Sequence, residues 1–383
     1  VIEGNERVVR PRLADAKFFF DQDRKMPLRA RLEGLNKVVY HNKLGTQLDK
    51  AKRVEALVPV ILGSLPASSV ATPALAVEAA QLAKCDLLTL MVGEFPELQG
   101  IMGRYYALAD GKSVELAEAI REHYLPRGAG DELPATSIGM ALALADKIDT
   151  IAGVFAIDQK PTGAKDPFGL RRAAIGIVRI LIERQLAVDL TALIANAVKL
   201  QPVTAKENVA VEVYEYIMER LRGYYLESTS DIAITTEMFD AVLANRPSSP
   251  LDFDRRLRAL HEFLQLSDAQ SLAAANKRIG NILRKSGQAS FGQVDSKLLR
   301  DPAEQVLFKQ VAAMSTFTEP LFAARDYGQA LAKLASLRAA VDTFFDGVMV
   351  MDEDTAVRNN RLALLAQLRS LFSRVADLSR LPG

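Results

Sequence analysis

Residues 138–155 read IGMALALADKIDTIAGVF, and this stretch decides the fold class. Its apolar side chains recur every three or four positions, which is the period of one face of an α-helix. The members of that face are Ile138, Leu142, Ala145, Ile148, Ala152 and Phe155. Asp146 lies inside the same apolar stretch, so the predicted helix carries a carboxylate that needs a partner wherever it is buried.

Apolar spacing of the same kind extends outward from this stretch over most of the chain. It predicts further helices over residues 170–185, 211–225, 254–266, 269–285, 301–316, 327–345 and 354–378. Patterns typical of strands are few, and they predict strands only over residues 6–10 and 37–40. We therefore expect an all-α protein with a minor β element near its N-terminus.

Two segments with helix-breaking residues divide the predicted helices. Residues 158–169 contain Pro161, Gly163, Pro167 and Gly169, so this segment is expected to form a loop. Residues 200–208 contain Pro202 and are interpreted as part of a linker. We predict a first helical domain over residues 1–199, a linker over residues 200–212 and a second helical domain over residues 213–383.

The composition narrows the class of protein. The 383 residues include 49% apolar side chains, which is enough for buried cores. Cys85 is the only cysteine, so no disulfide can form within the chain, and the cytoplasm is the expected location. No apolar run reaches the roughly 18 residues that a membrane span requires. The chain begins with Val1 instead of Met, which indicates a piece of a longer protein.

Charge is distributed unevenly along a nearly neutral chain. The formal net charge is +1, so the chain as a whole does not attract nucleic acid. Residues 159–184, 251–300 and 356–383 each carry a net charge of +4, whereas residues 205–245 carry −5. An RNA-binding protein needs such basic clusters to meet phosphates. The alternative is that these charges only solvate the outer faces of helices.

Four positions in the predicted first domain are arranged like the ligands of a metal site. Lys50, Cys85, Asp86 and Asp146 resemble, in order, the His, the His-Asp pair and the distant Asp of the helical HD superfamily. In that family two imidazoles and two carboxylates hold a divalent ion that activates water against a phosphate ester. Here only the two carboxylates are kept, and an ammonium at Lys50 opposes a cation. We predict a degenerate HD-like helical domain without a metal.

His41 lies nearby in the sequence and is an alternative ligand, although a lone histidine is more often a structural or surface residue. Two carboxylates alone hold magnesium only weakly, with several waters. A metal-dependent HD phosphohydrolase is therefore one alternative function. A helical scaffold that binds no RNA is another.

Longer strings in the same region resemble one family. They are MVGEFPELQG at residues 91–100, EHYLP at 122–126, ADKID at 145–149 and QKPTGAKDPFGLRR at 159–172. Together with GNERVVRPRLADAKFF at residues 4–19, they closely resemble the bacterial glycyl-tRNA synthetase beta subunit. The resemblance covers the whole chain in order, and strings of this length are far more specific than a short motif.

The resemblance implies a function. It implies that the chain binds tRNA(Gly) and works with an alpha subunit, in a heterotetramer of two alpha and two beta subunits. The alpha subunit would hold the class II site and use ATP and Mg²⁺, so this chain itself would bind no cofactor and have no catalytic residue. The HD-like part would face the acceptor end of the tRNA, and the C-terminal part would face the anticodon.

The predicted loop over residues 159–172, which leads into a helix, carries the expected contacts to the acceptor side. Its cations are Lys160, Lys165, Arg171 and Arg172. A basic loop that leads into a helix suits phosphate oxygens, because the dipole at the helix N-terminus adds to the charge. The alternative is a loop that only packs domains together.

The second predicted domain resembles the helical anticodon-binding module named for a DALR string. The resemblance rests on DRRLR at residues 254–258, ANKRIGNIL at 275–283, FFDGVMVM at 344–351 and RNNRLALL at 358–365. Unpaired anticodon bases are recognised through amides, guanidinium planes and aromatic stacking. The predicted contacts are Arg255, Arg256, Asn276, Lys277, Arg278, Arg284, Lys285, Arg358, Asn359 and Arg361. Asn281 and Asn360 offer further amides, and Tyr224, Tyr225 and Phe291 are either stacking partners or core residues.

Overall fold

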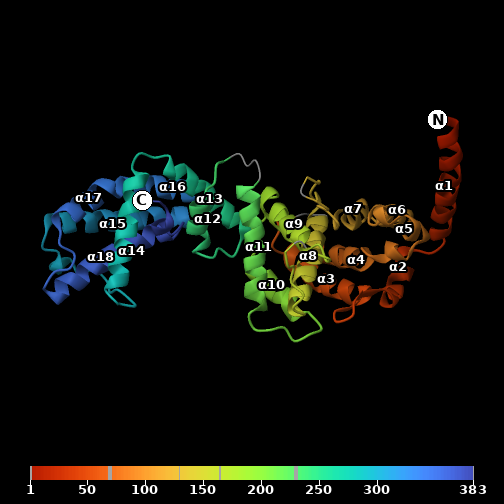
Figure 1. Cartoon of the computed structure of the whole chain (residues 1–383), viewed down its shortest axis with the longest axis horizontal. Helices are drawn as coiled ribbons and strands as arrows, with labels where there is room; N and C mark the ends of the chain where they lie inside the picture. Colours follow the sequence, from red (N-terminus) through yellow and green to blue (C-terminus); the bar gives the residue numbers. More distant parts are fainter. Residues whose placement is uncertain (1, 68–70, 129, 164, 228–231, 383) are drawn as a thin grey trace. The chain divides into compact units, whose positions relative to one another are not determined.

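The computed structural model describes residues 2–67, 71–128, 130–163, 165–227 and 232–382. The fold is all-α, as predicted (Figure 1). Within the described residues the strands are β1 (Val39–His41) and β2 (Gly45–Thr46), which form one small antiparallel sheet. No helix in the described part of the chain is both long and apolar enough to cross a membrane.

The chain divides into two compact units. Unit 1 comprises residues 1–221 and 249–251, and unit 2 comprises residues 222–248 and 252–383. The predicted linker over residues 200–212 lies inside unit 1. The helix α11 (Val209–Leu226) begins within that range, and the division between the two units falls inside this helix, between Leu221 and Arg222. Because this division falls inside a helix, no stretch of Pro, Gly or polar residues marks it in the sequence.

Unit 1 is built around one buried helix, α8 (Ser137–Ala156), which covers the sequence stretch that decided the fold class. Its apolar face is fully buried, and the Thr136 side chain caps its first turn by accepting from the backbone N–H of Gly139 at 3.0 Å. The helices around it are α3 (Gln47–Leu62), α4 (Pro73–Leu82), α7 (Val114–Glu122), α9 (Leu170–Glu183) and α10 (Leu190–Lys199).

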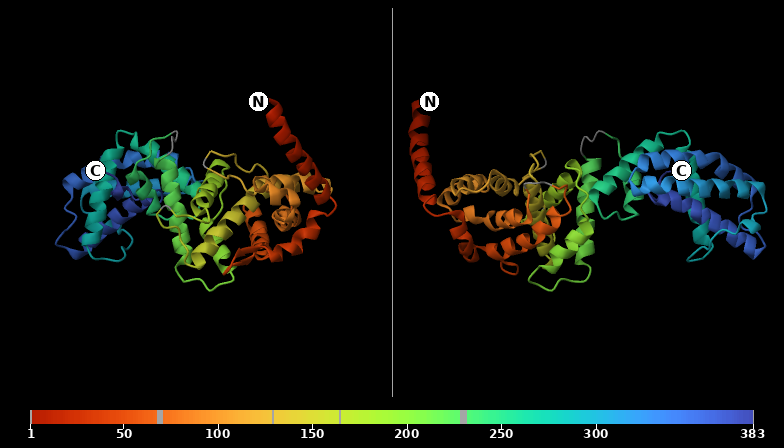
Figure 2. Two further views of the ribbon diagram at one scale, coloured as in Figure 1. Left: turned by 45° about the vertical axis from the view of Figure 1, so that its right-hand side comes forward. Right: turned by 180° about the vertical axis from the view of Figure 1, so that it is seen from behind.

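The remaining helices of unit 1 lie toward its N-terminal part. They are α1 (Ile2–Asp23), α2 (Leu28–Arg31), α5 (Leu90–Glu94) and α6 (Ile101–Ala109). Figure 2 shows α1 extending away from the other helices of the unit, with its C-terminal end beside them. Along this helix Val9 and Leu13 are exposed.

One of the two strand predictions was wrong. Residues 6–10 lie inside α1 instead of forming a strand. A strand needs a neighbouring strand for its N–H and C=O groups, whereas a helix satisfies them internally. The prediction over residues 37–40 was correct in part, because β1 begins at Val39 after a 3₁₀-helix over Leu32–Lys37.

Unit 2 is a bundle of helices around an aromatic core. The core includes Phe239, Phe253, Phe263, Phe344 and Phe372, all 2% exposed or less. The helices are α12 (Thr236–Leu243), α13 (Pro250–Leu264), α14 (Ala269–Lys285), α15 (Pro302–Ala323), α16 (Tyr327–Leu334), α17 (Arg338–Gly347) and α18 (Thr355–Ser373). The predicted helix over residues 327–345 is interrupted by a 3₁₀ turn at Ala335–Leu337. The last predicted helix ends at Ser373, and a 3₁₀ turn, η6 (Leu378–Arg380), follows it.

Candidate nucleic-acid interface

Two of the four positions that resemble HD ligands, Lys50 and Asp146, form a buried ion pair. Lys50, on α3, is buried and points at α8. Its Nζ lies 3.5 Å from Asp146 Oδ1 and 3.2 Å from Asp149 Oδ2, and it donates to Thr150 Oγ1 at 2.7 Å. Burial alone lowers the pKa of Lys50, but the Asp146 and Asp149 carboxylates outweigh it and hold that pKa above its ordinary value.

Both carboxylates have further cationic partners. Lys84 Nζ lies 3.4 Å from Asp146 Oδ1, and Arg53 Nε donates to Asp149 Oδ1 at 2.7 Å. Burial by itself raises the pKa of Asp146, but Lys50 and Lys84 hold it far below its ordinary value. The cluster is therefore a buried network of charges that joins α3 to α8.

The other predicted remnants of the metal site bond elsewhere. The Asp86 Oδ2 atom accepts from the backbone N–H groups of Gly100 at 2.6 Å and Gly103 at 3.0 Å, and burial raises the pKa of Asp86 to about 6. Burial also raises the pKa of the Cys85 thiol to about 12, so this cysteine is not an activated nucleophile. His41 contacts Gln159 Oε1 at 3.3 Å and the Phe168 ring. Across the described residues, no group of three or more His, Cys, Asp or Glu side chains is placed to hold a metal.

The N-terminus of α9 is closed by a side chain of the loop that precedes it. Asp166 accepts from the backbone N–H groups of Leu170 at 2.8 Å and Arg171 at 2.9 Å. A phosphate at this helix N-terminus, as predicted, would have to compete with that carboxylate. A carboxylate already uses the dipole there, and it would repel a phosphate.

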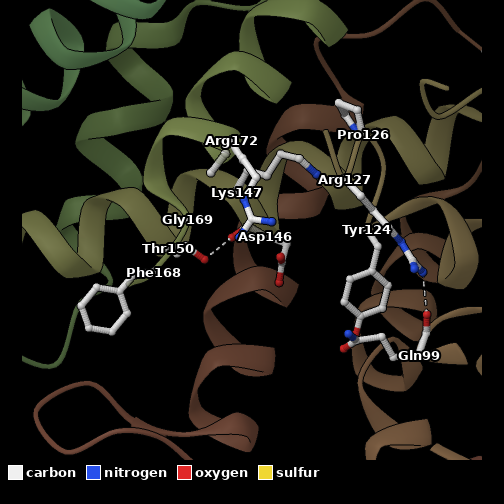
Figure 3. Close-up of a pocket in the computed structure, with 11 residues that line it drawn as sticks. Gln99, Tyr124, Pro126, Arg127, Asp146, Lys147, Thr150, Phe168, Gly169 and Arg172 are labelled. Atoms are coloured by element: carbon white, nitrogen blue, oxygen red, sulfur yellow. Dashed lines mark hydrogen bonds between the residues drawn. The ribbon is translucent and has the colours of Figure 1, made fainter. Parts of the chain in front are cut away.

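The four predicted cations of residues 159–172 differ in their surroundings. Lys160 Nζ lies 2.7 Å from Glu212 Oε2, and Arg171 donates to the Gly163 carbonyl. Lys165 is exposed, and its side chain contacts no partner within the described residues. Arg172 is also exposed and lines a cavity of about 350 Å³ in unit 1 (Figure 3).

The strongest basic surface lies in unit 2, along α14. The buried face of this helix carries Leu272, Ile279 and Leu283, so Lys277 and Arg284 point outward on the same side, seven residues apart. Beside them are Arg369, from α18, and Arg380, from η6. These four cations line a cavity of about 490 Å³ together with Gly280, Asn281, Asp377 and Ser379.

The one acid that lines this cavity, Asp377, already has hydrogen-bond partners within unit 2. Asp377 Oδ1 accepts from Ser379 Oγ at 2.7 Å and from Arg369 Nη2 at 3.3 Å. Its contact with Arg380 is longer, at 3.7 Å. Four cations therefore face one acid, and the cavity has a net positive charge.

Sequence reasoning found half of the cations that line this cavity. Lys277 and Arg284 were predicted because they share a helix, whereas Arg369 and Arg380 were missed because tertiary packing brings them there. The net charge of +4 over residues 356–383 was the signal that could have indicated them.

Three predicted contacts turn out to stabilise unit 2 itself. Asn276 is 3% exposed and donates to the Leu272 carbonyl at 3.0 Å. Arg361 is 7% exposed and is paired with the carboxylates of Glu304 and Asp352. The third, Arg256, pairs with Asp252 at 2.7 Å and donates to Tyr327 Oη at 3.0 Å. A guanidinium held in this way cannot reach a phosphate without breaking its internal contacts.

The other predicted contacts lie outside the cavity on α14. Arg278 lies 4.2 Å from the centre of the Phe345 ring, and Lys285 is exposed. Arg255 is half-buried, and Arg358 donates to the Asp352 carbonyl at 2.9 Å. Asn359 accepts from Gln288 Nε2 at 2.9 Å, whereas Asn360 is buried against Asp295. Of the aromatic candidates, Tyr225 is buried and bonds to Asp254, so it is a core residue.

Comparisons with known proteins identify the family. Residues 1–244 match the family model described as glycyl-tRNA synthetase beta subunit. The chain belongs to this family. Residues 272–378, which include most of the cavity on α14, match the model described as DALR anticodon binding domain.

Relatives agree with the family over the full chain. A protein of Marinobacter nauticus named glycine–tRNA ligase beta subunit is 51% identical over 383 residues, which are 100% of this chain and 54% of that protein. The protein of the same name from Janthinobacterium sp. is 52% identical over 382 residues, which are 100% of this chain and 53% of the relative. The chain thus spans about half the length of these members of the glycyl-tRNA synthetase beta subunit family.

Proposed function

We propose that this chain is the tRNA(Gly)-binding part of the beta subunit of a glycine–tRNA ligase. The observation that carries the proposal is the cavity on α14, where Lys277, Arg284, Arg369 and Arg380 surround a single, already paired acid. RNA binding depends on cations that are free to replace the counterions of phosphates. The match of this region to an anticodon-binding domain supports the same function.

The chemistry of the cavity suits an unpaired loop of RNA. Arginine planes can stack on bases and bind phosphates. The Asn281 oxygen accepts from Arg284 Nη2 at 2.6 Å, and its amide nitrogen offers donors for the edge of a base. Gly280 carries no side chain, and the Arg369 guanidinium lies 3.5 Å from where its Cβ would be. We therefore assign the anticodon arm of the tRNA to unit 2. The resemblance of the first domain to the beta-subunit family leads us to propose that unit 1 takes the acceptor arm.

The proposal extends to the whole enzyme. The alpha subunit would hold the catalytic site for glycine and use ATP and Mg²⁺, in an assembly of two alpha and two beta subunits in the cytoplasm. What supports this division is the chain's membership of the beta-subunit family.

Charge reversal at the cavity tests RNA binding directly. We expect Lys277→Glu combined with Arg284→Glu to weaken tRNA(Gly) binding by at least about tenfold, because two phosphate partners become repulsive. The slope of log Kd against log salt concentration should fall by roughly 1.5 to 2, measured by filter binding between low and physiological salt.

The matched control is Lys297→Glu with Lys309→Glu, which reverses two exposed lysines of unit 2 outside the cavity. This control should bind nearly as tightly as the wild type. If both double variants weakened tRNA binding equally, the effect would come from the overall charge of the chain and not from the cavity. Equal affinity of the wild type for tRNA(Gly) and unrelated tRNAs, with little salt dependence, would instead favour a scaffold that does not recognise RNA.

A further inference from the structure

The cavity of unit 1 lies where four separate stretches of sequence meet (Figure 3). Residues 91–100 contribute Gln99, residues 122–126 contribute Tyr124, residues 145–149 contribute Asp146, and residues 159–172 contribute Phe168 and Arg172. These are the four strings on which the family resemblance of this region rests. The fold therefore brings the most distinctive sequences of unit 1 to one concave site.

Aromatic rings and guanidinium groups form the walls and rim of this cavity. Tyr124 and Phe168 both line it, and the Arg127 guanidinium lies 5.6 Å from the centre of the Tyr124 ring. Gly169 has a φ of +65°, and a Cβ there would lie 3.0 Å from the Arg172 guanidinium. The missing side chain thus lets Arg172 lie against the backbone at the edge of the cavity.

The polar groups of the cavity leave capacity for hydrogen bonds. Among the described residues, Tyr124 Oη and Asp146 Oδ1 are buried and have no hydrogen-bond partner, although Lys50 and Lys84 neutralise the Asp146 carboxylate. The Gln99 side chain also lines the cavity. Donors and acceptors of this kind recognise the edge of a nucleobase.

The charge of the cavity favours an anion. Arg127, Lys147 and Arg172 line it against one carboxylate, Asp146, which is already neutralised. Lys147 Nζ donates to the Leu125 carbonyl at 2.6 Å, so its charge is held in place. Arg127 donates to the carbonyls of Glu97 and Gln99, at 3.2 and 2.9 Å, and is fixed at the rim.

We propose that this cavity binds one unpaired nucleotide from the 3′ end of the bound tRNA, whose acceptor arm we assign to unit 1. The base would lie against the aromatic walls, and Arg127 and Arg172 would hold its phosphate. A volume of about 350 Å³ is in the range of small-ligand pockets, and a paired base in a helix does not expose its face to such a site. This proposal rests on the proposed RNA-binding function. It adds which part of the tRNA binds to unit 1.

The test compares intact tRNA(Gly) with the same tRNA lacking its unpaired 3′ nucleotides. We expect the wild-type chain to lose about tenfold in affinity when these nucleotides are removed, because a stacked base and its phosphate contacts are lost. Phe168→Ala combined with Arg172→Gln should weaken binding of intact tRNA by a similar factor. The trimmed tRNA should bind the variant and the wild type equally, which is the signature of coupling between cavity and nucleotide.

Two further variants keep the test decisive. Arg172→Gln alone changes an exposed side chain, so it preserves the fold if the double variant does not. Lys199→Gln is the matched control, since it removes one exposed cation of unit 1 that lies outside the cavity and outside the predicted tRNA contacts. This control should retain the full loss on trimming. Free adenosine monophosphate, titrated against the wild type, distinguishes a free nucleotide from one carried by RNA.

The outcomes separate the two proposals. Equal loss on trimming in the wild type and in both cavity variants would overturn the nucleotide site while leaving tRNA binding intact. No loss on trimming in the wild type, or saturable binding of the free nucleotide without any effect of the tRNA 3′ end, would also overturn it. Failure of the wild type to bind either tRNA would instead contradict the proposed function itself.

Discussion

At the scale of single residues, Lys50 shows how one substitution of type changes the chemistry of a site. Its ammonium lies 3.5 Å from Asp146 Oδ1 and 3.2 Å from Asp149 Oδ2, so it supplies positive charge to two buried carboxylates. The charge requirement of the two carboxylates is thus met by the polypeptide. The position still matters for stability, because a buried carboxylate without a partner is costly.

Lys50→Met tests this role. We expect the variant to lose about 3 kcal/mol in the free energy of unfolding, because removing one partner of a buried pair leaves uncompensated charge. Urea unfolding followed by circular dichroism measures the change. Lys52→Met, an exposed lysine on the same helix, is the control and should stay within about 0.5 kcal/mol of the wild type. Equal stability of the two variants would contradict a structural role for the buried ammonium.

At the scale of elements, the sequence pattern located most helices. It failed where the structure of a segment depends on contacts with residues far away in the sequence. The helix over residues 269–285 was predicted with its observed bounds, because the spacing of its apolar residues depends only on neighbouring positions in the sequence. The strand predicted over residues 6–10 was wrong because strand pairing is not local. The capping of α9 by Asp166 was missed for a related reason, since a loop carboxylate gives no sign of which N–H groups it meets.

Asp166→Ala tests the cap on α9. Two N–H groups at the start of the helix lose their acceptor, so we expect a loss of about 1 kcal/mol in the free energy of unfolding. Thermal and urea unfolding measure the change. Glu207→Ala removes an exposed acid from a neighbouring loop and should have little effect. A similar loss in the control would show that the effect comes from charge and not from the cap.

At the scale of the whole chain, a net charge of +1 gives no sign of the basic surface that we propose as the RNA-binding site. Local charge indicated basic regions, but not which cations remain free. In the structure Arg256, Arg361 and Lys160 each have an acidic partner of their own. Arg369 and Arg380 come from different segments and share a single acid, Asp377, in the cavity on α14. Ion pairs depend on tertiary structure. A sequence therefore shows which residues are cationic, but not which of them are free to contact RNA.

The proposed division of labour between subunits leads to a prediction for the isolated chain. With glycine, ATP and Mg²⁺ present, we expect no glycyl-adenylate, because the catalytic site would belong to the alpha subunit. Pyrophosphate exchange measures this reaction, and the complete enzyme with its alpha subunit is the positive control. Adenylate formed by the chain alone would refute its assignment as a tRNA-binding part.

The ammonium of Lys50 also bears on how unit 1 assembles. A bridge made by a metal must be loaded after synthesis and can be stripped by a chelator. The bridge between α3 and α8 is encoded in the polypeptide, so it closes as the two helices come together. Its strength therefore does not vary with the supply of divalent ions in the cell.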